Sequence, residues 1–391
     1  MSLRESRALV VAVATVAAFT DLVAYSIAVP ILPDLSARLG ASPTTIGFLF
    51  GAFGITLLAV SIPMGAISDR VGRRGPLLGG LIALAASTLL FAYADGLVTL
   101  FAARLLQGAA DAVTWVVAFA LIADLYGPAE RGRVMGFVMS GTSFGFMIGP
   151  SLGGWLYEAG GVRLPFLAVA ILAALTAIVV AWLRPPAARA VREPVPLRLI
   201  LSLPAVLSCI AAVVVGASTT AMLEPVVSLW LASSLGLGPT RIGLVFGIAA
   251  VAAAILHPIY GRLADRYGGR TLTLLGLAAT AMMLPFLSRA TSFEMAVGLY
   301  LIQGAAISLI VTPSLAYMAE AMSRAGIESF GVAYGIYNVA WGVGLLLGPA
   351  IGGAMYERMG FARLAALWAP VVVVIAALLL ASGRASRRAA V

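Results

Sequence analysis

Five ionisable side chains lie inside otherwise apolar stretches of the chain: Asp21, Arg104, Asp111, Glu224 and His257. An ionised group at the centre of a membrane-spanning helix costs at least about 2.5–3.5 kcal/mol, so each of these residues marks a candidate functional site. A carboxyl group removed from water can hold a proton near neutral pH or pair with a cation, but it cannot favourably do both. Asp21 and Glu224 are therefore predicted to bind protons and a cationic substrate in competition.

The other groups have structural alternatives. Arg104 is expected to hold a carboxylate or the helix backbone, with direct control of proton release as the alternative. An ion pair with Arg104 would give Asp21 a structural role instead. Asp111 lies seven residues from Arg104 on the same helical face, with Gln107 between them, so one interpretation makes it simply the partner of Arg104. His257 either titrates near physiological pH or makes a local hydrogen bond.

Two neighbouring residues indicate how the carboxyl groups are placed. Tyr25 follows Asp21 by one helical turn on the same face, so its ring could complete a site for a cation. Pro225 follows Glu224 and frees a backbone carbonyl, which predicts an irregular segment of the kind that lines a cavity within a membrane.

The elements that carry these residues are predicted to be membrane-spanning helices. Hydrophobic residues make up 62% of the 391 residues and charged residues 10%, which excludes an ordinary soluble domain. The single cysteine excludes an internal disulfide and a cysteine-rich metal site, and neither a metal nor a cofactor is expected. The apolar runs predict an all-α polytopic membrane protein with twelve spans, at 8–32, 45–67, 76–94, 97–122, 134–157, 164–183, 202–231, 241–261, 271–289, 293–320, 330–355 and 361–382.

The basic residues give an orientation. They are all arginines, and they lie at the ends of the spans rather than in one patch, so the net charge of +9 does not predict a nucleic-acid partner. Most of them fall on one side of the predicted membrane. The positive-inside rule then places both termini in the cytoplasm and requires an even number of crossings.

The sequence contains an internal repeat. Three segments return 196 to 199 residues later in the same order: 65–74 as 261–270, 105–110 as 301–306, and 149–154 as 348–353. The repeat predicts two six-helix halves, 1–183 and 202–391, joined by a cytoplasmic linker at 184–201. Two halves in the same orientation are typical of the major facilitator fold, with the substrate site between them near the middle of the membrane.

A short loop motif follows the second span. Gly65 and Gly72 allow close helix approach and a sharp turn. Its charged residues can form salt bridges or cap helix ends, and they either anchor the topology or couple the loop to gating; they are Asp69, Arg70, Arg73 and Arg74. This segment resembles the loop signature of drug:proton antiporters of the major facilitator superfamily.

The fifth span carries a smooth glycine face. Gly141, Gly145, Gly149 and Gly153 recur every four residues, which favours close backbone packing in lipid. Pro150 deletes one backbone hydrogen bond and loosens the helix. The antiporter signature of the same family is resembled by Gly136, Gly145, Gly149-Pro150 and Gly153-Gly154. This resemblance implies an antiporter where packing alone would not.

A closer resemblance is to the vesicular amine transporters and their bacterial relatives. It rests on three stretches, Thr20-Asp21 with Ile27 to Pro33, Arg104 to Gly108, and Ala221 to Pro225 with Trp230. The resemblance implies that aromatic rings face the cation, although each could equally serve packing; the positions are Tyr25, Trp230, Phe246, Tyr334 and Trp341.

The chain also departs from the vesicular pattern. Those transporters carry a lysine in helix two and acidic residues in helices ten and eleven, where this chain has Phe53, Ser308 and Asn338. Their long first extracytoplasmic loop is missing as well. The departures favour a bacterial exporter with a simpler charge network, in which Asn338 remains a candidate substrate contact.

Together these features predict a proton-coupled antiporter that exports monoamine-like or amphipathic, drug-like organic cations by alternating access. It is expected to act as a monomer in the lipid bilayer of a bacterial cytoplasmic (inner) membrane. The alternative is export of a neutral or anionic metabolite, with Arg104 contacting the substrate. A membrane enzyme or a sensor is disfavoured, because the sequence shows no Ser/His/Asp set, metal-ligand cluster or phosphate-binding glycine loop.

Overall fold

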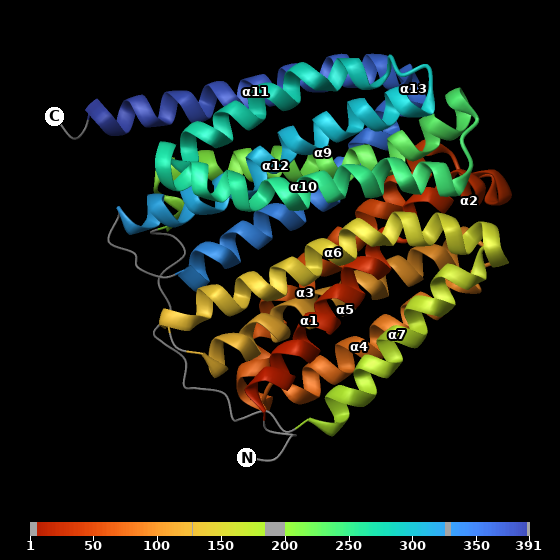
Figure 1. Ribbon diagram of the computed structural model, residues 1–391, viewed down its shortest axis with the longest axis horizontal. Helices are drawn as coiled ribbons and strands as arrows, with labels where there is room; N and C mark the ends of the chain where they lie inside the picture. The colour runs from red at the N-terminus through yellow and green to blue at the C-terminus, as the bar shows by residue number, and fades with distance from the viewer. Residues whose placement is uncertain (1–5, 127, 184–199, 325–329, 389–391) are drawn as a thin grey trace. The chain divides into compact units, whose positions relative to one another are not determined.

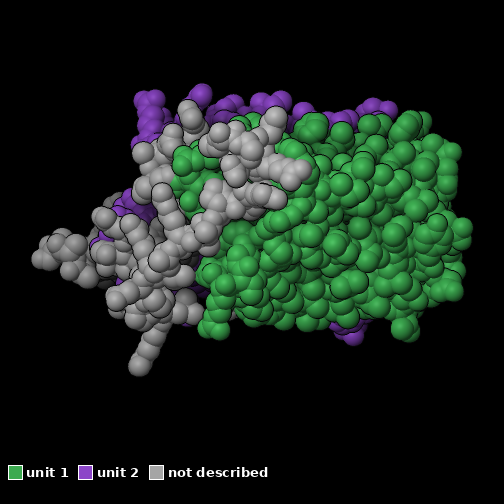
Figure 2. Space-filling model, turned by 90° about the horizontal axis from the view of Figure 1, so that it is seen from below, with its two compact units in different colours: residues 1–41, 49–192, 236–247 green, residues 42–48, 193–235, 248–391 purple. Residues whose placement is uncertain are grey.

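The computed structural model describes residues 6–126, 128–183, 200–324 and 330–388 (Figure 1). The predicted linker at 184–201 lies almost entirely outside this part of the chain. The described chain divides into two units, which Figure 2 shows in green and purple. Unit 1 consists of 1–41, 49–192 and 236–247, and unit 2 of 42–48, 193–235 and 248–391. Compared with the predicted halves, the units exchange two short segments, 42–48 and 236–247.

Unit 1 is built around its first helix. The helices are α1 (Arg7–Ser26), the short η2 (Val29–Ile31) and α2 (Leu32–Leu39), most of α3 (Pro43–Val71), α4 (Arg74–Ala92), α5 (Leu97–Leu125), α6 (Pro128–Gly160) and α7 (Arg163–Trp182). α1 packs against α5, α6 and α7, while α4 lies beside α5 and α7 (Figure 1). Polar residues of α1, among them Asp21, are therefore enclosed by apolar helices.

Unit 2 is likewise built from long helices. It contains α9 (Pro204–Leu235), most of α10 (Pro239–Tyr267), α11 (Gly269–Leu287), α12 (Phe293–Ser323) and α13 (Phe330–Arg388). Gly360 adopts a left-handed conformation, with φ 75°, and divides α13 into two arms. α13 packs along α9 and α11.

The prediction of an all-α polytopic protein is confirmed. Ten helical segments of the described residues are long and apolar enough to cross a membrane. α6 is a further long helix of 33 residues, and Gly360 divides the last of the ten. The first predicted span was too long as a single helix: α1 ends at Ser26, and η2 and α2 follow, because Pro30 and Pro33 have no backbone N–H to continue the hydrogen-bond ladder.

The glycine face of α6 packs directly on α1. Side-chain atoms placed at Gly141, Gly145, Gly149 or Gly153 would collide with α1; a Cβ at Gly145, for example, would lie 2.5 Å from the backbone carbonyl oxygen of Phe19. α13 uses the same device against α9, where Gly344, Gly348 and Gly352 face residues 217–222. Both repeats thus bring their first and fifth helices into backbone contact.

The exchanged segments are the first turns of α3 and α10, and each is held by a glutamate. In unit 1, Glu158 Oε1 accepts a hydrogen bond from the Thr240 backbone N–H at 3.0 Å. In unit 2, Glu357 Oε2 accepts one from the Thr44 backbone N–H at 2.9 Å. A carboxylate at a helix N-terminus satisfies an unpaired N–H group and complements the helix dipole. The two copies of the repeat therefore carry the same kind of glutamate cap, one at the N-terminus of α10 and one at that of α3.

We expect substitution of the α6 glycine face to weaken the α1–α6 contact. Gly145→Leu would push side-chain atoms against the Phe19 carbonyl and destabilise the fold by about 1–3 kcal/mol through overpacking. The control is Gly79→Ala on α4, where a Cβ meets no atom within 4 Å. The thermal unfolding midpoint of the detergent-purified protein should fall for Gly145→Leu alone. Equal midpoints for the two variants would contradict this packing.

The Glu357 cap should make part of the stability pH-dependent. Glu357 lies between the predicted spans 330–355 and 361–382, and hydrogen bonds from the side chains of Thr44 and Ser42 and the Thr44 N–H lower the pKa of its carboxyl below the ordinary 4.5. A lowered pKa in the folded state means that the stabilisation is present above pH 4.5 and is lost as the pH falls through the lowered value. Glu357→Gln should lower the thermal midpoint at pH 7, and the difference from wild type should shrink below pH 4.5. The exposed Asp95→Asn serves as control, and a difference that grows on acidification would refute the cap.

Candidate functional site

Asp21 occupies the centre of α1 and is buried, with 1% of its surface exposed. Among the described residues, no group donates a hydrogen bond to either of its carboxyl oxygens. A buried carboxylate without donors is costly, because it has lost water and gained no replacement. The site is thus suited to hold a proton or a cation, which would satisfy the carboxyl group.

Arg104 and Gln107 of α5 fasten this helix to α1. Arg104 is fully buried, and its guanidinium donates to Gln107 Oε1 at 2.6 Å and to the Tyr25 carbonyl at 3.4 and 3.5 Å. The Gln107 amide in turn donates to the Ala24 carbonyl at 3.1 Å. These bonds fit the predicted role of Arg104 as a group that holds helix backbone.

Aromatic rings surround the guanidinium and Tyr25. Arg104 Cζ lies 4.1 Å from the ring centroid of Phe50 and 5.5 Å from that of Tyr25. The Tyr25 ring contacts Phe53, with ring centroids 4.9 Å apart, and stacks on Phe146 of α6 at 6.4 Å. Phe53, which stands where the resemblance expects a lysine, is therefore part of the ring cluster beside the candidate site.

The carboxyl group that interacts with Asp21 is that of Asp111. The two side chains interact electrostatically, although neither oxygen of Asp21 has a hydrogen-bond partner among the described residues. Asp111 is also buried, with 7% of its surface exposed. The interpretation of Asp111 simply as a partner of Arg104 missed this pairing, because spacing along one helix says nothing about the register of the helix opposite.

Glu224 is the buried carboxyl group of unit 2, with 3% of its surface exposed. Its charge acts on the hydroxyl group of Tyr300 on α12. The irregular segment predicted at Pro225 is wrong: α9 is one helix from Pro204 to Leu235. Packing against α13 and α12 keeps the backbone helical despite the missing N–H. Glu224 is thus presented by a regular helix.

The aromatic candidates of unit 2 lie in separate contacts. Trp230 packs against Phe361, with ring centroids 5.2 Å apart. Trp341 stacks on Tyr337 at 6.4 Å, and Asn338 on the same helix is half-buried. The Tyr334 side chain lies outside the described residues. Phe246, on the segment of α10 that belongs to unit 1, is buried with 7% exposed.

The other polar groups of unit 2 differ in how they are bonded. His257 Nδ1 lies 2.6 Å from the Thr312 hydroxyl of α12, so its hydrogen bond is not local to α10. Ser308 donates to the Gly304 carbonyl at 2.9 Å. Gln303, the repeat counterpart of Gln107, is fully buried, and neither end of its amide has a hydrogen-bond partner among the described residues.

The charged loop motif forms an ion-pair cluster at the end of α3. Arg73 pairs with Asp69 at 2.5 Å and with Asp124 of α5 at 2.8 Å. Burial alone lowers the pKa of Arg73, but the hydrogen bonds and charges of Asp124 and Asp69 outweigh it and raise this pKa. Arg74 donates to the Ala181 carbonyl near the end of α7, as its repeat counterpart Arg270 does to the Leu379 carbonyl at 2.7 Å.

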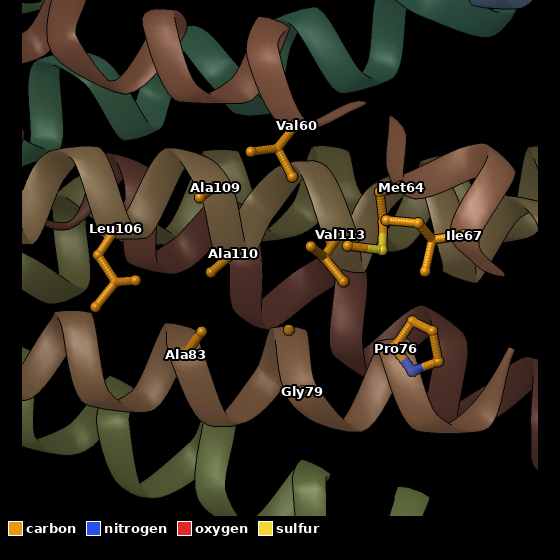
Figure 3. Close-up of a pocket in the computed structure, with 11 residues that line it drawn as sticks. Val60, Met64, Ile67, Pro76, Gly79, Ala83, Leu106, Ala109, Ala110 and Val113 are labelled. Carbon is orange, nitrogen blue, oxygen red and sulfur yellow. The ribbon is translucent and has the colours of Figure 1, made fainter. Parts of the chain in front are cut away.

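A groove on unit 1 is not part of this chemistry. Figure 3 shows it between α4 and α5, with α3 above, lined by Val60, Met64, Ala83, Leu106 and Val113 among other apolar residues. It contains no ionisable side chain, so it offers nothing that would recognise a proton or a charged substrate.

Three residues of the candidate site escaped the sequence reasoning. Tyr300 interacts electrostatically with Glu224, Tyr337 donates to the Val311 carbonyl at 2.9 Å, and Asp124 completes the loop cluster. The repeat gave a signal for one of them, since Tyr300 is the counterpart of Arg104. No group of His, Cys, Asp and Glu in the described residues could hold a metal ion.

Comparison with known proteins gives the family. The sequence profile of the Major Facilitator Superfamily matches residues 14–223 and 208–390. The chain belongs to this superfamily. It is a multi-pass membrane transporter rather than an enzyme, as are the relatives it matches.

Several of those relatives are vesicular transporters. The chain is 31% identical to the probable vesicular acetylcholine transporter-B of Danio rerio over 92% of its own length and 76% of that protein. It is 27% identical to the chromaffin granule amine transporter of Homo sapiens, over 86% of its length and 64% of that protein. The chain thus spans somewhat less than two thirds of the human protein. These matches confirm the resemblance to vesicular amine transporters.

The fold has solved counterparts. A bacterial homologue of the human lysosomal transporter Spinster, in an inward-facing and occupied conformation, superposes with a TM-score of 0.82. The alignment covers 97% of both chains at 18% sequence identity. At this identity the similarity confirms the major facilitator fold and does not extend to substrate.

The Arg73 cluster predicts unequal effects of neighbouring arginines. Arg73→Ala would remove the positive partner of the Asp69 and Asp124 carboxylates. We expect this loss to destabilise the folded protein by about 1–3 kcal/mol. Arg70→Ala, on the same loop but exposed, should change stability little. Thermal unfolding of both purified variants tests this. A loss as large for Arg70→Ala as for Arg73→Ala would show that loop charge alone matters.

Proposed function

We propose that this transporter is a proton-coupled antiporter that exports organic cations by alternating access. The observation that carries the proposal is Asp21, a fully enclosed carboxyl group that receives no hydrogen bond from the described residues. Such a group gains from a proton or from a cation, and each ligand excludes the other. Binding of one ligand therefore drives release of the other, which is the elementary step of exchange.

The surroundings of Asp21 favour a cation over an anion. The Tyr25 ring lies one turn from Asp21, and ring faces attract cations. Arg104, the nearby positive group, already donates to Gln107 and to the Tyr25 carbonyl. Its guanidinium is engaged in joining α1 to α5, which supports a structural role over one in binding an anionic substrate.

Glu224 supplies a second acidic site on the other unit. It is buried in α9, and its charge acts on Tyr300, so unit 2 also offers a buried carboxylate for a cation. In alternating access, release of a ligand is linked to a change between conformations that bind it with different affinity. We assign proton and cation sensing to both Asp21 and Glu224.

The names of the relatives support an amine as cargo. Those proteins are named as transporters of acetylcholine or of amines. We extend this cargo class to the present chain as organic cations, monoamine-like or amphipathic and drug-like. We further propose that it acts in a bacterial cytoplasmic membrane with both termini in the cytoplasm, as the arginine distribution indicates.

Transport by purified protein in proteoliposomes tests the proposal. With an imposed proton gradient, wild type should accumulate a protonated monoamine or a cationic dye and leave an acidic metabolite behind. Asp21→Asn and Glu224→Gln should each reduce cation flux by about tenfold or more, because a charge-assisted interaction contributes roughly 1.5–3 kcal/mol. The pH dependence of the remaining flux should flatten.

The matched control is Asp95→Asn, which removes an exposed carboxylate between α4 and α5 and should transport as wild type does. Unchanged flux and pH dependence in both Asp21→Asn and Glu224→Gln would refute the mechanism. Accumulation of the acidic metabolite, with no displacement by cations, would favour export of an anion instead.

A further inference from the structure

The register between α1 and α5 places a second carboxyl group against Asp21. Arg104 bonds to the carbonyl of Tyr25, and Gln107 bonds to that of Ala24. The residue number rises along α5 as it falls along α1, so the helices are antiparallel. Asp111 follows Gln107 by about one turn of α5, and Asp21 precedes Ala24 by about one turn of α1, so Asp111 and Asp21 lie at the same level. This register therefore places the two carboxyl groups at the same level between α1 and α5.

This contact favours a bound proton. The carboxyl groups of Asp21 and Asp111 are both buried and interact electrostatically. No described group donates a hydrogen bond to the oxygens of Asp21. Two neighbouring buried carboxylates repel one another strongly when both are ionised. Charge repulsion therefore favours a pair in which one carboxyl group carries a proton.

No further ionisable group faces the pair from the surrounding helices. The helices that pack on α1 and α5 are α3, α4, α6 and α7. Their stretches 43–68, 75–92, 134–156 and 164–182 contain no acidic, basic, tyrosine, histidine or cysteine residue. The charged or titratable neighbours within unit 1 are Tyr25 and Arg104, and Arg104 lies two turns from Asp111, about 10 Å along the helix.

We propose that Asp21 and Asp111 form one acidic site, which shares a single proton when empty and binds a protonated amine with at least two N–H donors when occupied. This rests on the proposed function and narrows its substrate class. Both members of the pair are buried, with 1% of Asp21 and 7% of Asp111 exposed.

The exchange conserves charge at the site. Before binding, the pair carries one proton and a net charge of −1. As the ammonium group arrives, the shared proton leaves to water, and each carboxylate accepts one N–H from the amine. The occupied site again has a net charge of −1, so one proton is exchanged for one univalent cation. A quaternary ammonium has no N–H and cannot bridge the two carboxylates in this way.

Infrared spectroscopy of the purified protein tests the shared proton without transport. Wild type should keep the carbonyl-stretch band of a protonated carboxylic acid at pH 7, and Asp95→Asn should keep it too. Asp111→Asn and Asp21→Asn should each lose the band, because the new amide donates to the remaining carboxylate. Asp111→Glu, which restores a carboxyl pair, should recover it. A band of wild-type intensity in Asp111→Asn would overturn the proposal.

Ligand binding tests the substrate class. Wild type should bind tryptamine at least about tenfold more tightly than its N,N,N-trimethyl derivative, because two charge-assisted hydrogen bonds are lost in the latter. Asp111→Asn should weaken the binding of tryptamine by a similar factor and leave the binding of the trimethyl compound nearly unchanged. The variant should therefore no longer discriminate between the two compounds. Discrimination that persists in correctly folded Asp111→Asn would refute the bridging site.

The two readouts separate this inference from the function on which it rests. If wild type binds and transports no cation but shows the shared-proton band, the proposed function fails and the carboxyl pair stands. If wild type exchanges cations for protons while Asp111→Asn keeps both the band and the amine preference, the function stands and the pair fails.

Discussion

The close contact of α1 with α6 is the constraint on which the candidate site depends. Glycines at 145, 149 and 153 let the α6 backbone approach α1 so closely that any side chain there would collide with it. On another side of α1, Arg104 and Gln107 of α5 bind its carbonyl groups. A helix held from both sides cannot rotate, and the carboxyl group of Asp21 is therefore fixed toward α5. Close packing and directed hydrogen bonds together position the acid.

The repeat supplies the scaffold twice but the chemistry differs between copies. Glycine faces on α6 and α13, the glutamate caps and the arginines that bind helix ends all recur. The charged residues of the fourth span do not recur in the tenth, since Tyr300 and Ile307 stand where the first copy has Arg104 and Asp111, although Gln107 returns as Gln303. Helix packing makes the same physical demand in both copies. The buried charges differ between the copies, so the repeat alone does not predict them.

Much of this could be predicted from the sequence, and the limits have physical reasons. Ionisable residues within apolar runs identified Asp21 and Glu224, because charge in lipid is too costly to be retained without use. The four-residue glycine spacing predicted a packing face on α6. The partner of Asp111 could not be predicted, because it depends on the register of α1 against α5. At Pro225 the prediction of an irregular segment was wrong, since tertiary packing kept α9 helical.

For the proposed antiport, the carboxyl pair also explains how exchange avoids leakage. An antiporter must not move while empty, because an empty carrier that returned alone would dissipate the gradient. A pair without proton or cation would carry two negative charges side by side among apolar helices, and that state is strongly disfavoured. Either ligand removes the second charge. A lone carboxylate would make the state without a ligand less costly. Pairing Asp21 with Asp111 therefore links movement of the transporter more strictly to binding of a proton or a cation. The lack of other ionisable groups on α3, α4, α6 and α7 between their ends ensures that no neighbour in unit 1 offsets the cost.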